Sequence, residues 1–126
     1  MPIDGSDCSY RALSFAVAMA DRYAAAIDVV HVTDEHTPRT DDVVARARTV
    51  LETAGRDGDV EVRTDLDRGY RPAEAVAETI LALVAERGYD HVVMGHHGDD
   101  AMVRAVLGST AEAVVDARRV PTTVVP

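Results

Sequence analysis

Short apolar runs alternate along the chain with longer segments in which apolar residues recur every three or four positions. The short runs are rich in β-branched residues and bounded by turn residues, so they predict strands over residues 29–32, 60–64, 90–95 and 120–125. The longer segments predict helices with apolar faces over residues 12–20, 43–50 and 76–84. Regular alternation of strands and helices predicts a three-layer α/β/α sandwich around an open, mainly parallel five-stranded sheet.

The first of the five strands is predicted to be truncated. Only residues 1–3 precede an Asp-Gly-Ser turn, whereas an ordinary strand has about five or six residues. We therefore expect the native start of the chain to lie upstream of Met1. Residues 33–42 are polar, and we interpret them as a surface connection between the second strand and the second helix.

Two further helix ends carry recognisable signals. Pro72 and Gly88 flank the third helical segment in the order that helix starts and stops favour. After the strand at 90–95, a last helix is predicted to open with Gly108, Ser109 and Thr110.

The last strand, between Pro121 and Pro126, is predicted to be an exposed edge strand, which needs either protection or a pairing partner.

Length and composition indicate one ordered domain over residues 1–126, because 47% of the residues are apolar and 28% are charged. The apolar runs are much shorter than the roughly 20 residues that span a bilayer, so no membrane role is expected. A single cysteine, Cys8, and no apolar leader predict a cytoplasmic protein.

The net charge of −9 argues against binding to nucleic acid, because phosphate backbones reward clustered basic residues. All 13 basic residues are arginine. An acidic surface without lysine is typical of a protein that works at high salt, where charge repulsion is screened. Genomic base composition explains the same bias, and the sequence leaves both explanations open.

Glycines and hydroxyl residues gather between residues 95 and 110. Gly95 and Gly98 follow a predicted buried strand, and Gly108, Ser109 and Thr110 open the next helix. In an open parallel sheet ligands bind where strands end and helices begin, and a helix N-terminus favours phosphate. The stretch is therefore a candidate polyphosphate cradle. The structural alternative is a simple turn followed by a side-chain helix cap.

The spacing G-x2-G-x9-G-S from Gly95 to Ser109 resembles the nucleotide-binding signature of the universal stress protein family. Three other segments resemble the same family: Pro2 to Ser6, the His31-Val32 pair and the ending RVPTTVVP. The resemblance covers nearly the whole chain and lacks only the front of the first strand.

This resemblance implies a nucleotide-binding protein with a regulatory or stress-response role. It implies a domain of the adenine nucleotide α-hydrolase-like type, a homodimer formed through the C-terminal strand, and ATP, with or without Mg²⁺, as the ligand. Asp4 and the Val32 backbone would meet the adenine, and Pro2 would border the ribose. Gly95 would lie near the ribose or first phosphate. The phosphates would be surrounded by Gly98, Gly108, Ser109 and Thr110.

Two alternatives keep the fold but change the function. Asp99 and Asp100 follow Gly98, where many relatives carry a basic or neutral polar residue, and two carboxylates repel a triphosphate unless a cation bridges them. If they hold a metal, slow ATP hydrolysis or phosphoryl transfer becomes an alternative, although no general base is visible. If they exclude nucleotide, the chain is an interaction protein of the same fold.

Histidine and cysteine give no metal or catalytic prediction. His96 and His97 are adjacent and lack further ligands at suitable spacing, so we interpret them as solvent-facing loop residues. Cys8 has no paired base and is interpreted as a small packed residue. We predict no metal site and no catalytic residue.

Overall fold

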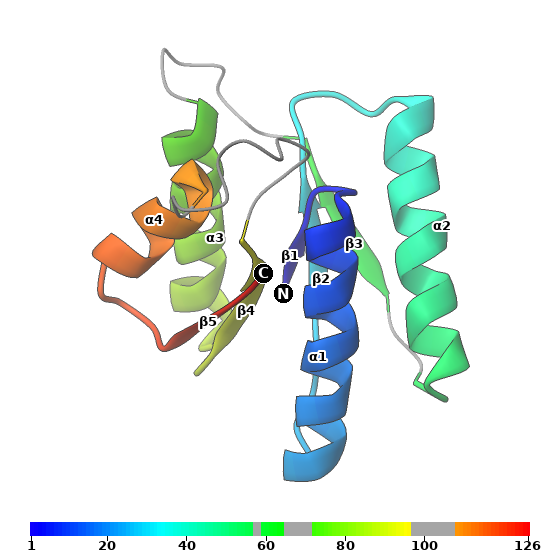
Figure 1. Ribbon diagram of the computed structural model, residues 1–126. Coiled ribbons are helices and arrows are strands. Elements are labelled where there is room, and N and C mark those ends of the chain that lie inside the picture. Colours follow the sequence, from blue (N-terminus) through cyan, green and yellow to red (C-terminus); the bar gives the residue numbers. More distant parts are fainter. Residues whose placement is uncertain (57–58, 65–71, 97–107) are drawn as a thin grey trace.

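The computed structural model describes residues 1–56, 59–64, 72–96 and 108–126 (Figure 1). Strands and helices alternate along it, as the hydrophobic pattern predicts. The element order is β1 (Pro2–Ile3), α1 (Asp7–Tyr23), β2 (Val29–Val32), α2 (Pro38–Thr53), β3 (Val60–Arg63), α3 (Pro72–Arg87), β4 (Val92–Gly95), α4 (Ser109–Asp116) and β5 (Thr122–Val125).

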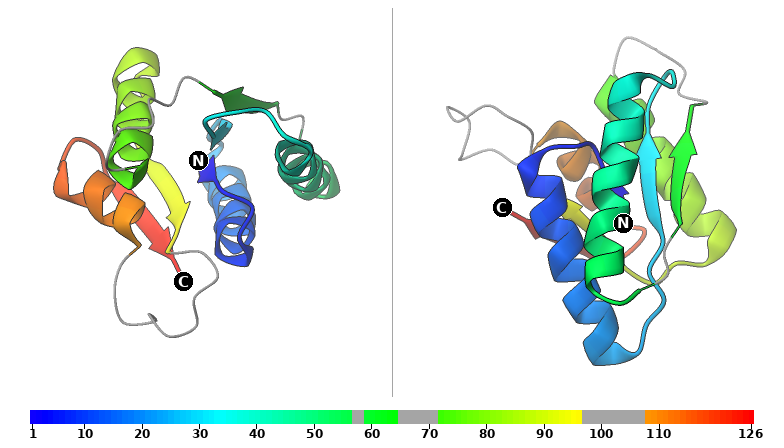
Figure 2. Two further views of the ribbon diagram at one scale, coloured as in Figure 1. Left: turned by 90° about the horizontal axis from the view of Figure 1, so that it is seen from above. Right: turned by 90° about the vertical axis from the view of Figure 1, so that its right-hand side faces the viewer.

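Helices cover both faces of the strands, which confirms the predicted three-layer α/β/α arrangement. Figure 2 shows α1 and α2 on one side and α3 and α4 on the other. On the first side, α1 and α2 bury apolar residues such as Leu13 and Leu51 against β1, β2 and β3. On the second side, Ile80 of α3 and Val114 of α4 pack against β4. Two apolar layers therefore hold the strands between them.

The strands are parallel and do not close into a barrel. Their hydrogen bonds form two groups rather than one continuous sheet. β1, β2 and β3 pair in that order, and β4 pairs with β5. β1 lies beside β4, yet no ladder joins these two strands within the described residues. The reason is the short first strand, which has two residues, one of them a proline without an N–H group.

The start of α2 differs from the sequence prediction. Residues 33–42 were expected to be a loop, but the helix already begins at Pro38. Thr37 caps it, and the side chains of Thr37 and Thr40 each accept a hydrogen bond from the other residue's backbone N–H. The hydrophobic pattern missed this first turn because most of its residues are exposed.

The start of α1 also lies earlier than the segment 12–20 in which the apolar spacing predicts a helix. Ser6 is the N-cap, and its hydroxyl accepts a hydrogen bond from the Ser9 N–H at 3.1 Å. The preceding turn requires glycine, because Gly5 has φ +88° and an added Cβ would lie 2.7 Å from Cγ2 of Val43. The Asp-Gly-Ser motif thus directs the chain from β1 into α1 next to α2.

Candidate functional site

A pocket of 320 Å³ lies at the carboxyl ends of β1, β2 and β4. The first residues of α4 and the side chains of α3 form its other walls. Ligands of open α/β folds bind at this edge of the sheet, where strand order reverses. Here the reversal lies between β1 and β4, because the chain builds outward from β1 on one side and from β4 on the other.

The pocket brings together nearly all the residues that the sequence singled out, although they lie far apart in the chain. Its lining includes Pro2, Asp4, Val32, Gly95, Gly108, Ser109 and Thr110. Gly98, Asp99 and Asp100 lie outside the described residues. The roles of the lining residues in binding remain predictions, but their shared position is a property of the fold.

Asp4 follows β1 directly and is exposed at the pocket. Its Oδ1 accepts a hydrogen bond from the Ser6 N–H at 2.9 Å, which fixes the side chain at the turn. A carboxylate has two oxygens and several acceptor positions, so Asp4 retains capacity for a donor in the pocket.

Gly95 has a packing role that the sequence did not separate from ligand binding. A Cβ built on Gly95 would lie 2.8 Å from the Ser9 nitrogen and 2.9 Å from the carbonyl carbon of Cys8. Both are backbone atoms of the first turn of α1, which have no rotamer to change. Glycine is therefore required here so that α1 can approach the end of β4.

The N-terminus of α4 opens toward the pocket without a side-chain cap. Gly108 is its N-cap, with φ −57° and ψ 141°, so the predicted helix start at Gly108 is displaced by one residue to Ser109. The Gly108 N–H donates to the His96 carbonyl at 2.9 Å. The next three N–H groups, of Ser109, Thr110 and Ala111, belong to the first helical turn and have no intrahelical acceptor.

The apolar wall of the pocket was not identified from the sequence. It includes Ile3 from β1, Met94 from β4, and Val76 and Ile80 from α3. In the sequence these residues carry only the periodic signal of core positions, which is the same for a pocket wall and a filled interior. Only the packing of α3 against the strand ends separates the two cases.

His96 is wrongly predicted as a solvent-facing residue. It is half-buried and lines the pocket. Its N–H donates to the Val125 carbonyl at 2.7 Å, and its own carbonyl accepts from Gly108. The backbone of His96 thus connects β4 to β5 and to the start of α4. His97 lies outside the described residues.

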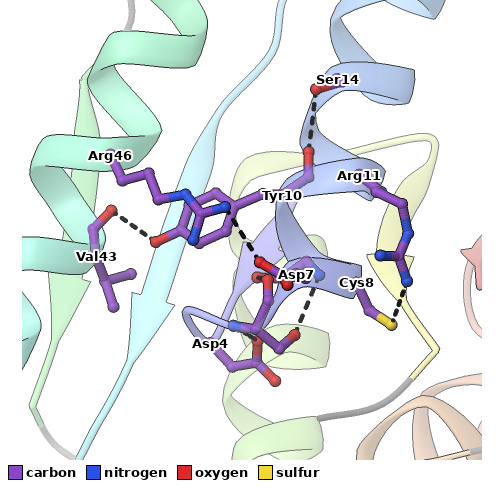
Figure 3. A network of polar contacts seen from close by, with 10 residues as sticks. Asp4, Asp7, Cys8, Tyr10, Arg11, Ser14, Val43 and Arg46 are labelled. Atoms are coloured by element: carbon purple, nitrogen blue, oxygen red, sulfur yellow. Dashed lines mark hydrogen bonds and ion pairs between the residues drawn. The ribbon is translucent and has the colours of Figure 1, made fainter. Parts of the chain in front are cut away.

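The described lining carries little positive charge. Apart from His96, the only ionisable side chain of the described lining is the Asp4 carboxylate. The described lining includes no arginine. Arg11, on α1, instead donates to the Pro126 carbonyl at 2.9 Å and to the sulfur of Cys8 (Figure 3). Cys8 is half-buried and does not line the pocket.

The described residues contain neither a cluster of metal-ligating side chains nor a membrane-spanning helix. Among the described residues, no three His, Cys, Asp or Glu side chains gather closely enough to hold a metal ion. In the same part of the chain, no helix combines the length and apolar character needed to cross a membrane.

Comparison with known proteins identifies the family. The sequence pattern of the universal stress protein family matches residues 1–126. No curated protein sequence matches the chain.

Solved structures share the fold. A universal stress protein from Archaeoglobus fulgidus superposes with a TM-score of 0.74 at 19% identity, over 99% of this chain and 95% of that one. A family member from Burkholderia pseudomallei gives 0.70 at 22% identity, over 99% and 92%. A universal stress protein in complex with cAMP gives 0.69 at 21% identity, over 100% and 94%. With the family pattern matched from the first residue to the last, this chain belongs to the universal stress protein family.

Proposed function

We propose that this protein binds an adenine nucleotide in the 320 Å³ pocket and acts as a regulatory protein in the response to stress. The observation that carries the proposal is the pairing, in one pocket, of an apolar wall with an uncapped helix N-terminus. An apolar wall suits a flat base, and free N–H groups at a helix start suit a phosphate. The complex of a related fold with cAMP supports the same ligand class.

In the proposed complex, the base, the ribose and the phosphate lie in the order in which these groups line the pocket. The base lies against Val32 and Met94, and its exocyclic amine donates to the Asp4 carboxylate. The ribose lies near Pro2 and Gly95, and phosphate lies at the start of α4. ATP, with or without Mg²⁺, is the ligand that the sequence resemblance implies.

Calorimetric titration of ATP with Mg²⁺, and of AMP, tests this proposal. We expect saturable binding by the parent chain and at least a tenfold loss of affinity in Val76→Trp, because the larger ring occupies the pocket from α3. Ala82→Trp is the matched control, since Ala82 is exposed on the same helix and does not line this pocket. Absence of binding by a folded parent chain would refute the proposal.

We further propose a homodimer formed through β5. In the single chain β5 pairs with β4 alone among the described strands, and its four residues are half-buried. The Pro121 and Val125 carbonyls face β4, where they accept from Val92 and His96. Because strand groups alternate in direction, the N–H and carbonyl of Val124 face the open edge. An antiparallel or parallel partner strand would satisfy them.

For this dimer, light scattering should give twice the mass of one chain. Val124→Pro should give a monomer, because proline removes the outward N–H without removing a hydrogen bond to β4. Val124→Ala retains that N–H and should remain dimeric. A parent chain that is monomeric even at molar salt would contradict the proposal.

A further inference from the structure

The end of β1 is held by a buried histidine of the neighbouring strand. His31, on β2, is buried and does not line the pocket. Its Nδ1 lies 2.9 Å from the carbonyl oxygen of Ile3. Side chains alternate between the two faces of a strand, so His31 faces the same side as Val29, which packs in the layer of α1 and α2. Of the His31-Val32 pair, only Val32 therefore lines the pocket.

The chemistry of this contact fixes the tautomer of His31. A carbonyl oxygen only accepts hydrogen bonds, so Nδ1 carries a proton and donates it to the Ile3 carbonyl. The other neutral tautomer would place a nitrogen lone pair against the oxygen. Burial of an unpaired polar group costs free energy, which adds to the preference for the Nδ1–H form. The imidazole of His31 is thus a hydrogen-bond donor to β1.

The carbonyl of Ile3 belongs to the peptide group that joins β1 to Asp4. This peptide is trans, so its carbonyl and the Asp4 N–H point in opposite directions. Because the carbonyl points toward β2, the Asp4 N–H points to the other side of β1, where β4 lies. No described residue accepts a hydrogen bond from this N–H. The contact with His31 therefore sets the orientation of an open donor on a residue that lines the pocket.

Few other contacts restrain this peptide group. β1 has two residues, and no ladder joins it to β4 within the described part of the chain. Before Ile3, the Met1 carbonyl accepts from the Val30 N–H at 2.9 Å. After it, Oδ1 of Asp4 accepts from the Ser6 N–H (Figure 3). His31 acts between these two contacts, at the point where the strand changes into the turn.

We infer that His31 is a positioning residue of the pocket. Its hydrogen bond to the Ile3 carbonyl holds the end of β1, and with it Asp4, in the orientation that the ligand meets, while the imidazole itself does not touch the ligand. The inference rests on the proposed function for the identity of that ligand, an adenine nucleotide. The contact between His31 and β1 is independent of the ligand and is testable without it.

Nitrogen NMR spectroscopy of the imidazole tests the contact in the free chain. At a pH where the ring is neutral, we expect the proton of His31 to reside on Nδ1. The Asp4 amide resonance should shift in His31→Leu, which has no donor, and return close to its original position in His31→Asn, whose side-chain amide donates from the place of Nδ1. A proton on Nε2 in the parent chain, or an unmoved Asp4 resonance in folded His31→Leu, overturns the inference. If His31→Leu does not fold, the tautomer of the parent chain decides.

Calorimetric titration of AMP separates positioning from stability. We expect affinity to fall about tenfold in His31→Leu and to stay within about twofold of the parent in His31→Asn. Thr40→Val is the matched control, because Thr40 is also buried and hydrogen-bonded but does not line the pocket. This variant should lower the urea midpoint and leave AMP affinity unchanged.

Equal AMP affinities in His31→Leu and Thr40→Val overturn the inference and leave the proposed function standing. If the folded parent chain binds neither AMP nor ATP, the proposed function fails. The NMR result then decides alone whether His31 positions Asp4.

Discussion

Gly95→Ala is expected to lower the free energy of unfolding by roughly 2–3 kcal/mol, at the upper end of the cost of overpacking. The added Cβ would lie 2.8 Å from the Ser9 nitrogen and 2.9 Å from the Cys8 carbonyl carbon. Because these are backbone atoms, relief requires the whole first turn of α1 to move away from β4. Urea unfolding followed by circular dichroism measures the loss.

A second glycine provides the matched control. Gly88 has φ +68° and open space around its Cβ position, so Gly88→Ala carries backbone strain without a collision. Its expected cost is about 1–2 kcal/mol, the usual penalty for a left-handed alanine. If Gly95→Ala costs no more than Gly88→Ala, the close approach of α1 to β4 is not what requires glycine at position 95.

The same displacement of α1 should impair the pocket. Gly95 lines the pocket, and Ser9, which an added Cβ would push, lines it as well. We therefore expect Gly95→Ala to weaken nucleotide binding even where the protein is kept folded by low temperature. Because this one substitution affects both the packing of α1 and the pocket, the sequence alone cannot show which of the two requires a glycine at the end of β4.

The fold could be predicted from the sequence because each helix has an apolar face and each strand a β-branched run. The exceptions have local causes. The first turn of α2 was missed because its signal is the Thr37 cap and Pro38 rather than apolar spacing. The separation of β1 from β4 was missed because hydrogen bonding between strands depends on backbone length and donors, which hydrophobic patterns do not report.

The site was predictable only in its turns and helix start. Asp4 and Gly108 stand at the ends of elements, where parallel topology brings residues together. Ile80 and Met94 were not identified, because an apolar residue beside a pocket has the same sequence signal as one in a filled core. The hydrogen bonds that cap the N-terminus of α1 were also not predicted, because they form between Ser6 and Ser9 within one turn.

Stability of the 126-residue chain with a free amine on Met1 is expected to increase between pH 6 and pH 8. Burial lowers the pKa of this amine from its ordinary value near 8 to about 6, and the nearby Asp28 carboxylate opposes the shift. Between these values the unfolded chain binds the proton and the folded chain does not. The free energy of unfolding therefore rises with pH across this window, by roughly 2–3 kcal/mol in total.

Urea unfolding near pH 5.5 and pH 8.5, at constant high salt, measures this difference. The control is the same chain with an acetylated α-amine, which has no proton to bind. Met1 lines two further pockets, of 30 and 170 Å³, so the acetyl group has space beside β1. The acetylated chain should lose most of the pH dependence between 6 and 8, because the two chains differ only at the α-amine. An equal pH dependence in the two chains would show that the amine is solvated in the folded state. The Met1 amine would then still donate to the Asp28 carbonyl at 2.8 Å but would keep its hydration in the folded chain.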